Sequence, residues 1–250
     1  IVAGLVLLAA FVLRQLRVEH PLMRVQIFRD RGFAADNAVL FLLMIVFVPL
    51  FLFASLYAQI SLGEDASGAG LYLLIFFGGY WAGAQWGGRQ LDSRGVRAAV
   101  IPGCALAAVG FFLWGESLTD LDSGDHWIYM VMAGAGTGAI LGPASTDALN
   151  RAPSTSYGEA TGILQTLRNF GSSLGLAVLG TILILENKAN IESSLTGLGI
   201  PTERAEAIAD SLSQSGGGSG AAGFGEAAGR GAQRVLEAVR HDFAESTQVI

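Results

Sequence analysis

The chain has 250 residues, of which 52% are hydrophobic and only 14% are charged, and its formal net charge is −6. Soluble domains usually carry about 25% charged residues, and the deficit here is concentrated in long uncharged runs typical of membrane segments. The net charge says little about a nucleic-acid partner, and we expect none. The single cysteine, Cys104, excludes a disulfide framework or a cysteine-based metal site.

Six apolar segments are predicted to cross a bilayer as helices. A span needs roughly 20 apolar residues, because the hydrocarbon core is about 30 Å thick and a helix rises about 1.5 Å per residue. The segments are 1–16, 34–60, 69–88, 98–115, 127–149 and 160–185. The predicted fold class is therefore an all-α polytopic membrane protein. We interpret the chain as a fragment, in which residues 1–16 are a partial span and a further span follows Ile250.

The charges of the loops orient these segments. The loops at 17–33, 89–97 and 150–159 contain arginines, whereas those at 61–68 and 116–126 contain no Lys or Arg. Because positive charge is retained in the cytoplasm, the first three loops are predicted to be cytoplasmic and the other two external. The chain is therefore expected to be a multi-pass protein of the plasma membrane, the inner membrane of a bacterium.

The segment 186–250 is polar and is predicted to form a long external loop. It contains two weakly amphipathic stretches, at about 201–213 and 231–245, on either side of a glycine-rich linker.

Three of the predicted spans carry glycines four residues apart. This spacing places them on one helix face, where two backbones can approach closely. Tight helix packing is the ordinary interpretation, and contacts between moving helices are compatible with it. The glycines are Gly79, Gly83 and Gly87, then Gly134, Gly138 and Gly142, then Gly171 and Gly175.

A polar stripe marks the last predicted span. Arg168 lies about eight residues into that span, so roughly 12 Å from its start at about 1.5 Å per residue. A charge at that depth normally faces protein or a water-filled cavity. It either lines a transport cavity or makes a structural contact, with an acid such as Asp147 or with backbone carbonyls. The stripe consists of Thr161, Gln165, Arg168, Asn169 and Ser172.

Four further polar or aromatic residues are candidates for a cavity. Asp36 and Asn37 open the second span, where Asp36 either caps the helix start or is a protonatable coupling site. Trp81 and Gln85 suit a broad cavity for lipophilic ligands, although such residues more often pack.

The sequence shows no set of catalytic residues, and we expect neither an enzyme nor a cofactor or metal. The three histidines, His20, His126 and His241, are predicted to lie in separate loops, with His126 at the membrane interface. Zinc-protease, nucleophile-elbow and phosphate-loop motifs are absent from the sequence.

The charged loop between the third and fourth spans resembles a known signature. Gly88, Asp92, Gly95 and Arg97 match the loop motif G-x-x-x-D-[RK]-x-G-[RK]-[RK] of the major facilitator superfamily. Ser93 and Val96 depart from it, and Arg94 partly compensates. The glycines permit a tight turn, Asp92 can stabilise a helix N-terminus, and the arginines anchor the cytoplasmic face.

Two longer stretches, residues 20–33 and 142–183, resemble the 14-span drug:proton antiporter branch of that superfamily (EmrB/QacA-like). The resemblance implies that residues 1–16 are span 8, that 17–33 are a cytoplasmic linker, and that 34–185 are five spans of the C-terminal bundle.

The resemblance also implies proton-coupled export of lipophilic, drug-like compounds by alternating access. The implied partners are the bilayer, protons, a small lipophilic substrate and an N-terminal bundle that this chain lacks. Transport of a specific metabolite and a non-transporting membrane scaffold remain alternatives.

Overall fold

The computed structural model describes residues 25–120, 123–152, 157–197 and 230–249, together with Ala10, Arg14 and Thr202. All regular elements in this part of the chain are helical, which confirms the predicted all-α class. The predicted span 1–16 and the predicted stretch 201–213 lie outside it, apart from the three single residues. The elements are η1 (Val25–Arg29), α2 (Arg31–Ile60), α3 (Ala66–Arg94), α4 (Val96–Ser117), η2 (Leu118–Asp120), α5 (Ser123–Arg151), α6 (Tyr157–Gly197) and α9 (Arg230–Val249).

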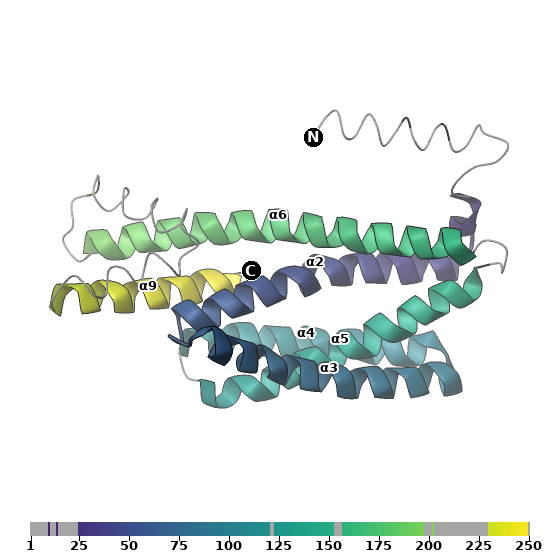
Figure 1. The fold of residues 1–250 in the computed structure, drawn as a ribbon, viewed down its shortest axis with the longest axis horizontal. Coiled ribbons are helices and arrows are strands. Elements are labelled where there is room, and N and C mark those ends of the chain that lie inside the picture. Colours follow the sequence, from purple (N-terminus) through teal and green to yellow (C-terminus); the bar gives the residue numbers. More distant parts are fainter. Residues whose placement is uncertain are drawn as a thin grey trace.

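The helices form two groups that run side by side (Figure 1). In the first group, α5 packs along both α3 and α4, and in the second α2 packs along α6. Contacts of α2 with α5 and α3 join the groups. The shorter α9 lies against the far end of α6 and also touches η2 and α2. The start of α2, the start of α6 and the end of α5 meet at one end of the bundle.

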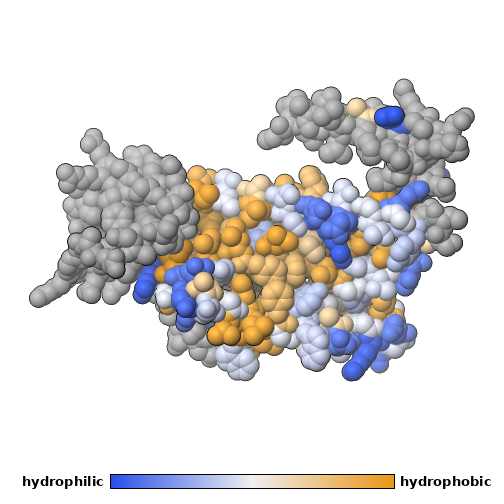
Figure 2. All heavy atoms as spheres, viewed as in Figure 1, coloured by the Kyte–Doolittle hydropathy of each residue, from blue (hydrophilic) through white to orange (hydrophobic). Residues whose placement is uncertain are grey.

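Four of these helices are long and apolar enough to cross a membrane by length and composition. They are α2, α4, the His126–Arg151 part of α5, and α6. The predicted span 69–88 lies in α3, which is equally long but richer in glycine and polar residues, and which is not one of the four. Figure 2 shows hydrophobic residues gathered across the middle of the bundle, with hydrophilic residues on either side.

The junction between α3 and α4 is much tighter than predicted. The expected loop 89–97 is reduced to Gly95, because α3 continues to Arg94 and α4 begins at Val96. Gly95 has a φ of +85°, in the region that only glycine adopts readily. The charged residues before it extend an exposed helix end instead of forming a loop.

The last predicted span also ends later than expected. Instead of stopping near residue 185, α6 continues to Gly197. Asn187, Ile191 and Leu195 are buried at four-residue intervals along this extension. It packs against α9, where Asn190 donates to Ser246 Oγ at 3.2 Å and Ser194 donates to Asp242 Oδ1 at 2.8 Å. The described parts of the segment 186–250 therefore include the end of α6, up to Gly197, and α9, which covers the predicted amphipathic stretch 231–245.

Asp30, and not Asp36, caps the start of α2. Its Oδ1 accepts hydrogen bonds from the backbone N–H groups of Gly32 at 2.7 Å and Phe33 at 2.9 Å. The suggestion that Asp36 caps this helix is wrong, because the helix begins five residues before it. The hydrogen bond from Phe33, followed by that from Gly32 and the charge of Arg151, holds the pKa of Asp30 below its ordinary value.

We expect Asp30→Ala to lower the thermal midpoint of the purified protein at pH 6, because two N–H groups lose their acceptor. A depressed pKa gives stability that is present above the unfolded pKa, near 3.8, and is lost as the pH falls through the folded value. The deficit should therefore shrink below about pH 4. Thermal unfolding in detergent at several pH values measures it, with Asp92→Ala as an exposed control. A deficit that is constant with pH would contradict the cap.

Glycines bring α3 and α5 into backbone contact. A Cβ built on Gly79 would overlap the carbonyl oxygen of Val131, and one on Gly83 would overlap that of Ala135. The fit is reciprocal, since Gly134 and Gly138 of α5 face the carbonyl oxygens of Phe76 and Tyr80 in the same way. Gly87 continues this seam, where a Cβ would lie 2.9 Å from the Cα of Ala139.

A second seam of the same kind joins α6 to α2. Gly171 faces the carbonyl oxygen of Phe41, at 2.6 Å from an added Cβ, and Gly175 faces that of Ile45. The expectation of close packing does not hold for Gly142, since no atom of the described chain lies within 4 Å of the Cβ it would carry.

Candidate functional site

A cluster of three acids around one arginine lies where α2 begins and α5 ends. Arg151 Nε is 2.6 Å from Asp147 Oδ2 and 3.6 Å from Asp36 Oδ2, and its Nη1 is 3.7 Å from Asp30 Oδ1. Asp30 and Arg151 are at the surface, whereas the Asp36 residue is only 7% exposed. The cluster therefore extends from the predicted cytoplasmic surface into the contact between α2 and α5.

The carboxyl groups of Asp36 and Asp147 share one arginine. Each has its Oδ2 within 3.6 Å of the same guanidinium nitrogen of Arg151. Asn37, 1% exposed, is next to Asp36 and donates to the carbonyl oxygen of Phe33 at 2.8 Å. The predicted pair of Asp36 and Asn37 is thus buried, and the Asp36 carboxyl group shares Arg151 with Asp147.

Arg168 lies in a separate polar group between α6 and α5. Its Nη2 donates to Ser145 Oγ, and Ser145 in turn donates to the carbonyl oxygen of Leu141. The pairing of Arg168 with Asp147 is wrong, because Asp147 is bound to Arg151 one turn along its own helix. Arg168 Nε has no hydrogen-bond partner in the described structure.

The other polar residues of the α6 stripe lie around Arg168. Gln165 Nε2 donates to Asn169 Oδ1 at 3.1 Å, and both side chains are exposed. Ser172 Oγ donates to the carbonyl oxygen of Arg168 at 2.9 Å. The stripe predicted from the sequence therefore places the hydrogen-bonded amides of Gln165 and Asn169 beside Arg168 on α6.

Trp81 and Gln85 are not part of either group. Both are exposed on α3, with Trp81 68% exposed, and they lie away from the glycine face that packs on α5. Neither side chain makes a hydrogen bond or a ring contact with another described residue, so their role in lining a cavity stays a prediction.

The residues of the loop signature occupy helix ends. Gly88, Asp92 and Arg94 belong to the last turns of α3, Gly95 forms the junction, and Arg97 is in the first turn of α4. The expected capping by Asp92 is not seen, since the first residues of α4 receive no side-chain hydrogen bond. Arg94 lies at the C-terminus of α3, where a positive charge is favoured by the helix dipole.

A buried network around His126 was not foreseen. His126 was predicted to be an interfacial loop residue, but it is in α5 and only 1% exposed. Its Nε2 is 2.8 Å from the carbonyl oxygen of Ser117, and its Nδ1 is 3.3 Å from the Tyr72 hydroxyl. Because a carbonyl only accepts, Nε2 must donate, and a neutral ring then accepts from Tyr72 at Nδ1. Tyr72 also accepts from Trp114 Nε1 at 3.0 Å, so the network fastens α3, α4 and α5 together.

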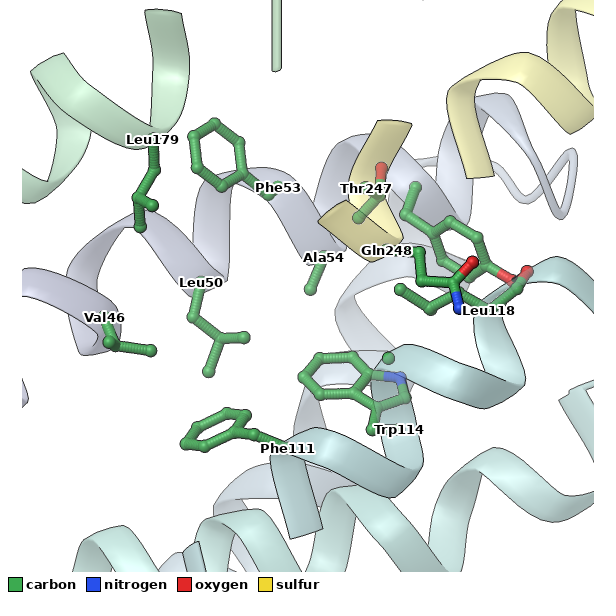
Figure 3. Close-up of a pocket in the computed structure, with 12 residues that line it drawn as sticks. Val46, Leu50, Phe53, Ala54, Phe111, Trp114, Leu118, Leu179, Thr247 and Gln248 are labelled. Atoms are coloured by element: carbon green, nitrogen blue, oxygen red, sulfur yellow. Dashed lines mark hydrogen bonds between the residues drawn. The ribbon is translucent and has the colours of Figure 1, made fainter. Parts of the chain in front are cut away.

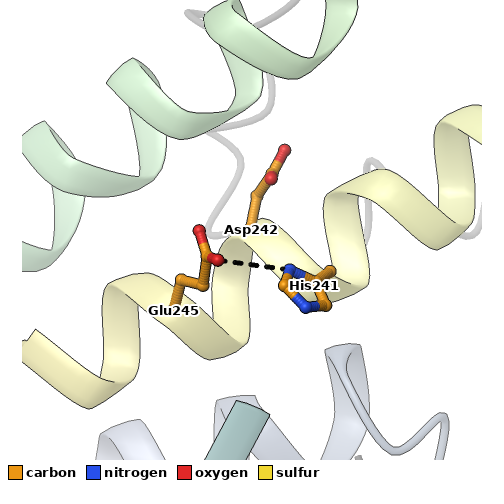
Figure 4. Close-up of side chains that lie close together, drawn as sticks. All are labelled: His241, Asp242 and Glu245. Atoms are coloured by element: carbon orange, nitrogen blue, oxygen red, sulfur yellow. Dashed lines mark ion pairs between the residues drawn. The ribbon is translucent and has the colours of Figure 1, made fainter.

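Three potential metal ligands lie on α9, but their contacts are explained without a metal. Ligand atoms of His241, Asp242 and Glu245 lie within 4.8 Å of one another. Figure 4 shows that Asp242 turns away from the other two, and Ser194 of α6 donates to it. His241 and Glu245, both about half exposed, form an ion pair of 3.5 Å. We assign no ion to this group.

Comparisons with known proteins match this architecture. The profile of the Major Facilitator Superfamily matches residues 1–176. The lincomycin resistance protein LmrB of Listeria monocytogenes is 32% identical over 78% of this chain and 41% of its own length. The tetracenomycin C resistance and export protein of Streptomyces glaucescens is 29% identical over 72% of the chain and 34% of its own length. The multidrug resistance protein Stp of Mycobacterium tuberculosis is 27% identical over 75% of the chain and 35% of its own length.

The chain thus spans less than half the length of these curated relatives. The family match covers most of the chain, including the predicted loop signature, the acid cluster and Arg168. Together with the apolar helices of the bundle, it identifies the chain as a multi-pass plasma-membrane protein that belongs to the Major Facilitator Superfamily, a family of transporters and not of enzymes.

Proposed function

We propose that this chain is the C-terminal part of a transporter that exports lipophilic, drug-like compounds by proton antiport through alternating access. The drug-resistance and export names of the relatives support the direction and the substrate class. The resemblance of residues 20–33 and 142–183 supports the 14-span branch. The complete protein would supply the N-terminal bundle that faces this one.

The observation that carries the proton coupling is the approach of Asp36 and Asp147 to the same Arg151. Two carboxylates beside one arginine leave one negative charge unbalanced, and a proton on either carboxyl group removes it. Asp36 is on the α2–α6 group and Asp147 is on the α3–α4–α5 group. A proton at this point therefore acts on the contact between the two groups of helices, which is where a coupling ion can favour one arrangement over another.

Export is tested with the complete gene in a bacterial host that lacks its own efflux pumps. Expression should raise resistance to several lipophilic compounds and lower their accumulation, and a protonophore should reverse the second effect. Unchanged accumulation across a broad panel of compounds would argue against the proposal. Resistance to one compound class alone would instead favour a specific transporter.

We expect Arg168→Ala to reduce export by about tenfold or more, which corresponds to about 1.4 kcal/mol. The variant removes the charge that the polar stripe surrounds and leaves Ser145 without its donor. Thr166→Ala, an exposed residue on the same helix, is the control for expression and folding. Arg168→Lys should keep part of the activity, since it keeps the charge but not the guanidinium geometry. Full activity of Arg168→Ala would show that the arginine has only a structural contact.

A further inference from the structure

The guanidinium group of Arg151 lies against the first turn of α2, at a residue that has no side chain. A Cβ built on Gly32 would overlap three atoms of that group, Cζ, Nη1 and Nε. Arg151 is the last residue of α5, whereas Gly32 is the second residue of α2. A side chain from one helix group therefore reaches over the backbone of the other, and the glycine leaves the space in which it lies.

The arginine is held at this place by acids and not by the helix that it touches. The first turn of a helix carries a partial positive charge, which disfavours a cation. Three carboxylates offset this effect, since Asp147 and Asp36 lie 2.6 Å and 3.6 Å from Arg151 Nε, and Asp30 lies 3.7 Å from its Nη1. The position of the guanidinium group is thus set by these acids and by the backbone of Gly32.

The contact at Gly32 can change without a movement of either helix. The three atoms nearest to the added Cβ all belong to the far end of the Arg151 side chain. At Gly83, by contrast, the nearest atoms belong to the backbone of Ala135. Gly32→Ala would therefore displace the guanidinium group and leave the backbones of α2 and α5 where they are.

The link between α2 and α5 is electrostatic at this end of the bundle. Among the described residues of these two helices, Arg151 and Asp36 form the only ion pair between them. Further along α2 the two helix groups meet through apolar side chains, such as Leu50, Phe111 and Leu179 around a pocket between α2, α4 and α6 (Figure 3). The position of the Arg151 guanidinium group therefore decides how near a positive charge lies to Asp36.

We infer that Gly32 is a positioning residue, which allows the Arg151 guanidinium group to lie between Asp36 and Asp147. Its effect on transport rests on the proposed proton coupling, whereas its contact with Arg151 does not. A side chain at position 32 would move the positive charge, and the two carboxyl groups would no longer share one arginine. Proton binding would then lose its influence on the contact between the helix groups, although a substrate could still bind.

A double-mutant cycle on the purified complete protein tests the contact. The change in thermal midpoint caused by Gly32→Ala should be more unfavourable in the parent than in Arg151→Ala, by about 2 °C or more. In the Arg151→Ala background the substitution should be neutral or slightly stabilising, because alanine favours a helix more than glycine does. Equal effects in the two backgrounds would overturn the inference, and so would a failure of Gly32→Ala to fold in both.

Gly158→Ala is the matched control for this cycle. Gly158 is likewise the second residue of its helix, α6, and no described atom lies within 4 Å of its added Cβ. The effect of Gly158→Ala on the thermal midpoint should therefore be the same with and without Arg151→Ala.

Transport by the complete protein in inverted vesicles tests the functional consequence. The probe is ethidium, a lipophilic fluorescent cation, or the compound of the resistance panel that the parent exports best. Gly32→Ala should lower accumulation driven by a pH gradient at least fivefold and leave the exchange of labelled for unlabelled probe unchanged, whereas a general structural defect would lower both. Gly158→Ala should alter neither.

The two assays fail in different ways. Parental driven accumulation in Gly32→Ala would overturn the positioning role of Gly32. Normal driven accumulation in Asp36→Asn would instead overturn the proposed proton coupling, while an effect of Gly32→Ala that depends on Arg151 would still establish where the guanidinium group lies.

Discussion

Replacement of Asp36 by Asn is expected to abolish proton-driven export by the complete protein. The amide keeps the size of the carboxyl group but never carries its charge, so it imitates the protonated state permanently. Arg151 keeps its 2.6 Å contact with Asp147, and the helix contact should survive. A transporter fixed in the protonated arrangement cannot release the proton that drives its cycle.

Two assays separate coupling from binding. In inverted vesicles, accumulation of a fluorescent substrate driven by a pH gradient should fall to the level of vesicles without the transporter. Exchange of labelled for unlabelled substrate without a gradient should continue, because it needs no net proton movement. Asp30→Asn, a surface acid near the same arginine, should retain driven transport and is the matched control. Normal driven accumulation in Asp36→Asn would exclude Asp36 as the coupling residue.

The sequence predicted the helical class well, because uncharged runs of sufficient length have few alternatives to a membrane helix. The ends of those helices were less predictable. The charged residues from Arg89 to Arg94 read as a loop, but they are compatible with an exposed helix end, and only Gly95 requires a turn. The extension of α6 depends on burial against α9, a contact between segments far apart in the chain.

Contacts within the candidate site also fall into two kinds: those that follow from spacing along one helix, and those that depend on how separate helices pack. The pairing of Asp147 with Arg151 is a local signal, since residues four apart on a helix are neighbours, and it could have replaced the incorrect pairing with Arg168. The approach of Asp36 to the same arginine could not be read from spacing, because it depends on how α2 crosses α5. His126 was misplaced for a similar reason, as its partners Tyr72 and Ser117 come from α3 and α4.

The second large effect is expected at Gly83, and a glycine five residues away on the same helix provides its control. The Cβ of Gly83→Ala would overlap the carbonyl oxygen of Ala135, a backbone atom that cannot move without shifting α5. Gly78 has no atom within 4 Å of its added Cβ. Both substitutions gain up to about 1 kcal/mol in helix propensity. The difference in stability between the two variants therefore measures the cost of the overlap at Gly83.

We therefore expect Gly83→Ala to lose about 1–3 kcal/mol of stability by overpacking, whereas Gly78→Ala should be neutral or slightly stabilising. The thermal midpoint of each variant in detergent, followed by loss of the monodisperse gel-filtration peak, measures the difference. Because Gly134 and Gly138 make the same close approach from the α5 side, Gly134→Ala should repeat the loss seen for Gly83→Ala. If Gly83→Ala were as stable as Gly78→Ala, α3 and α5 could not be packed backbone to backbone, and the position of Asp147 at the end of α5 relative to α2 would need to be reconsidered.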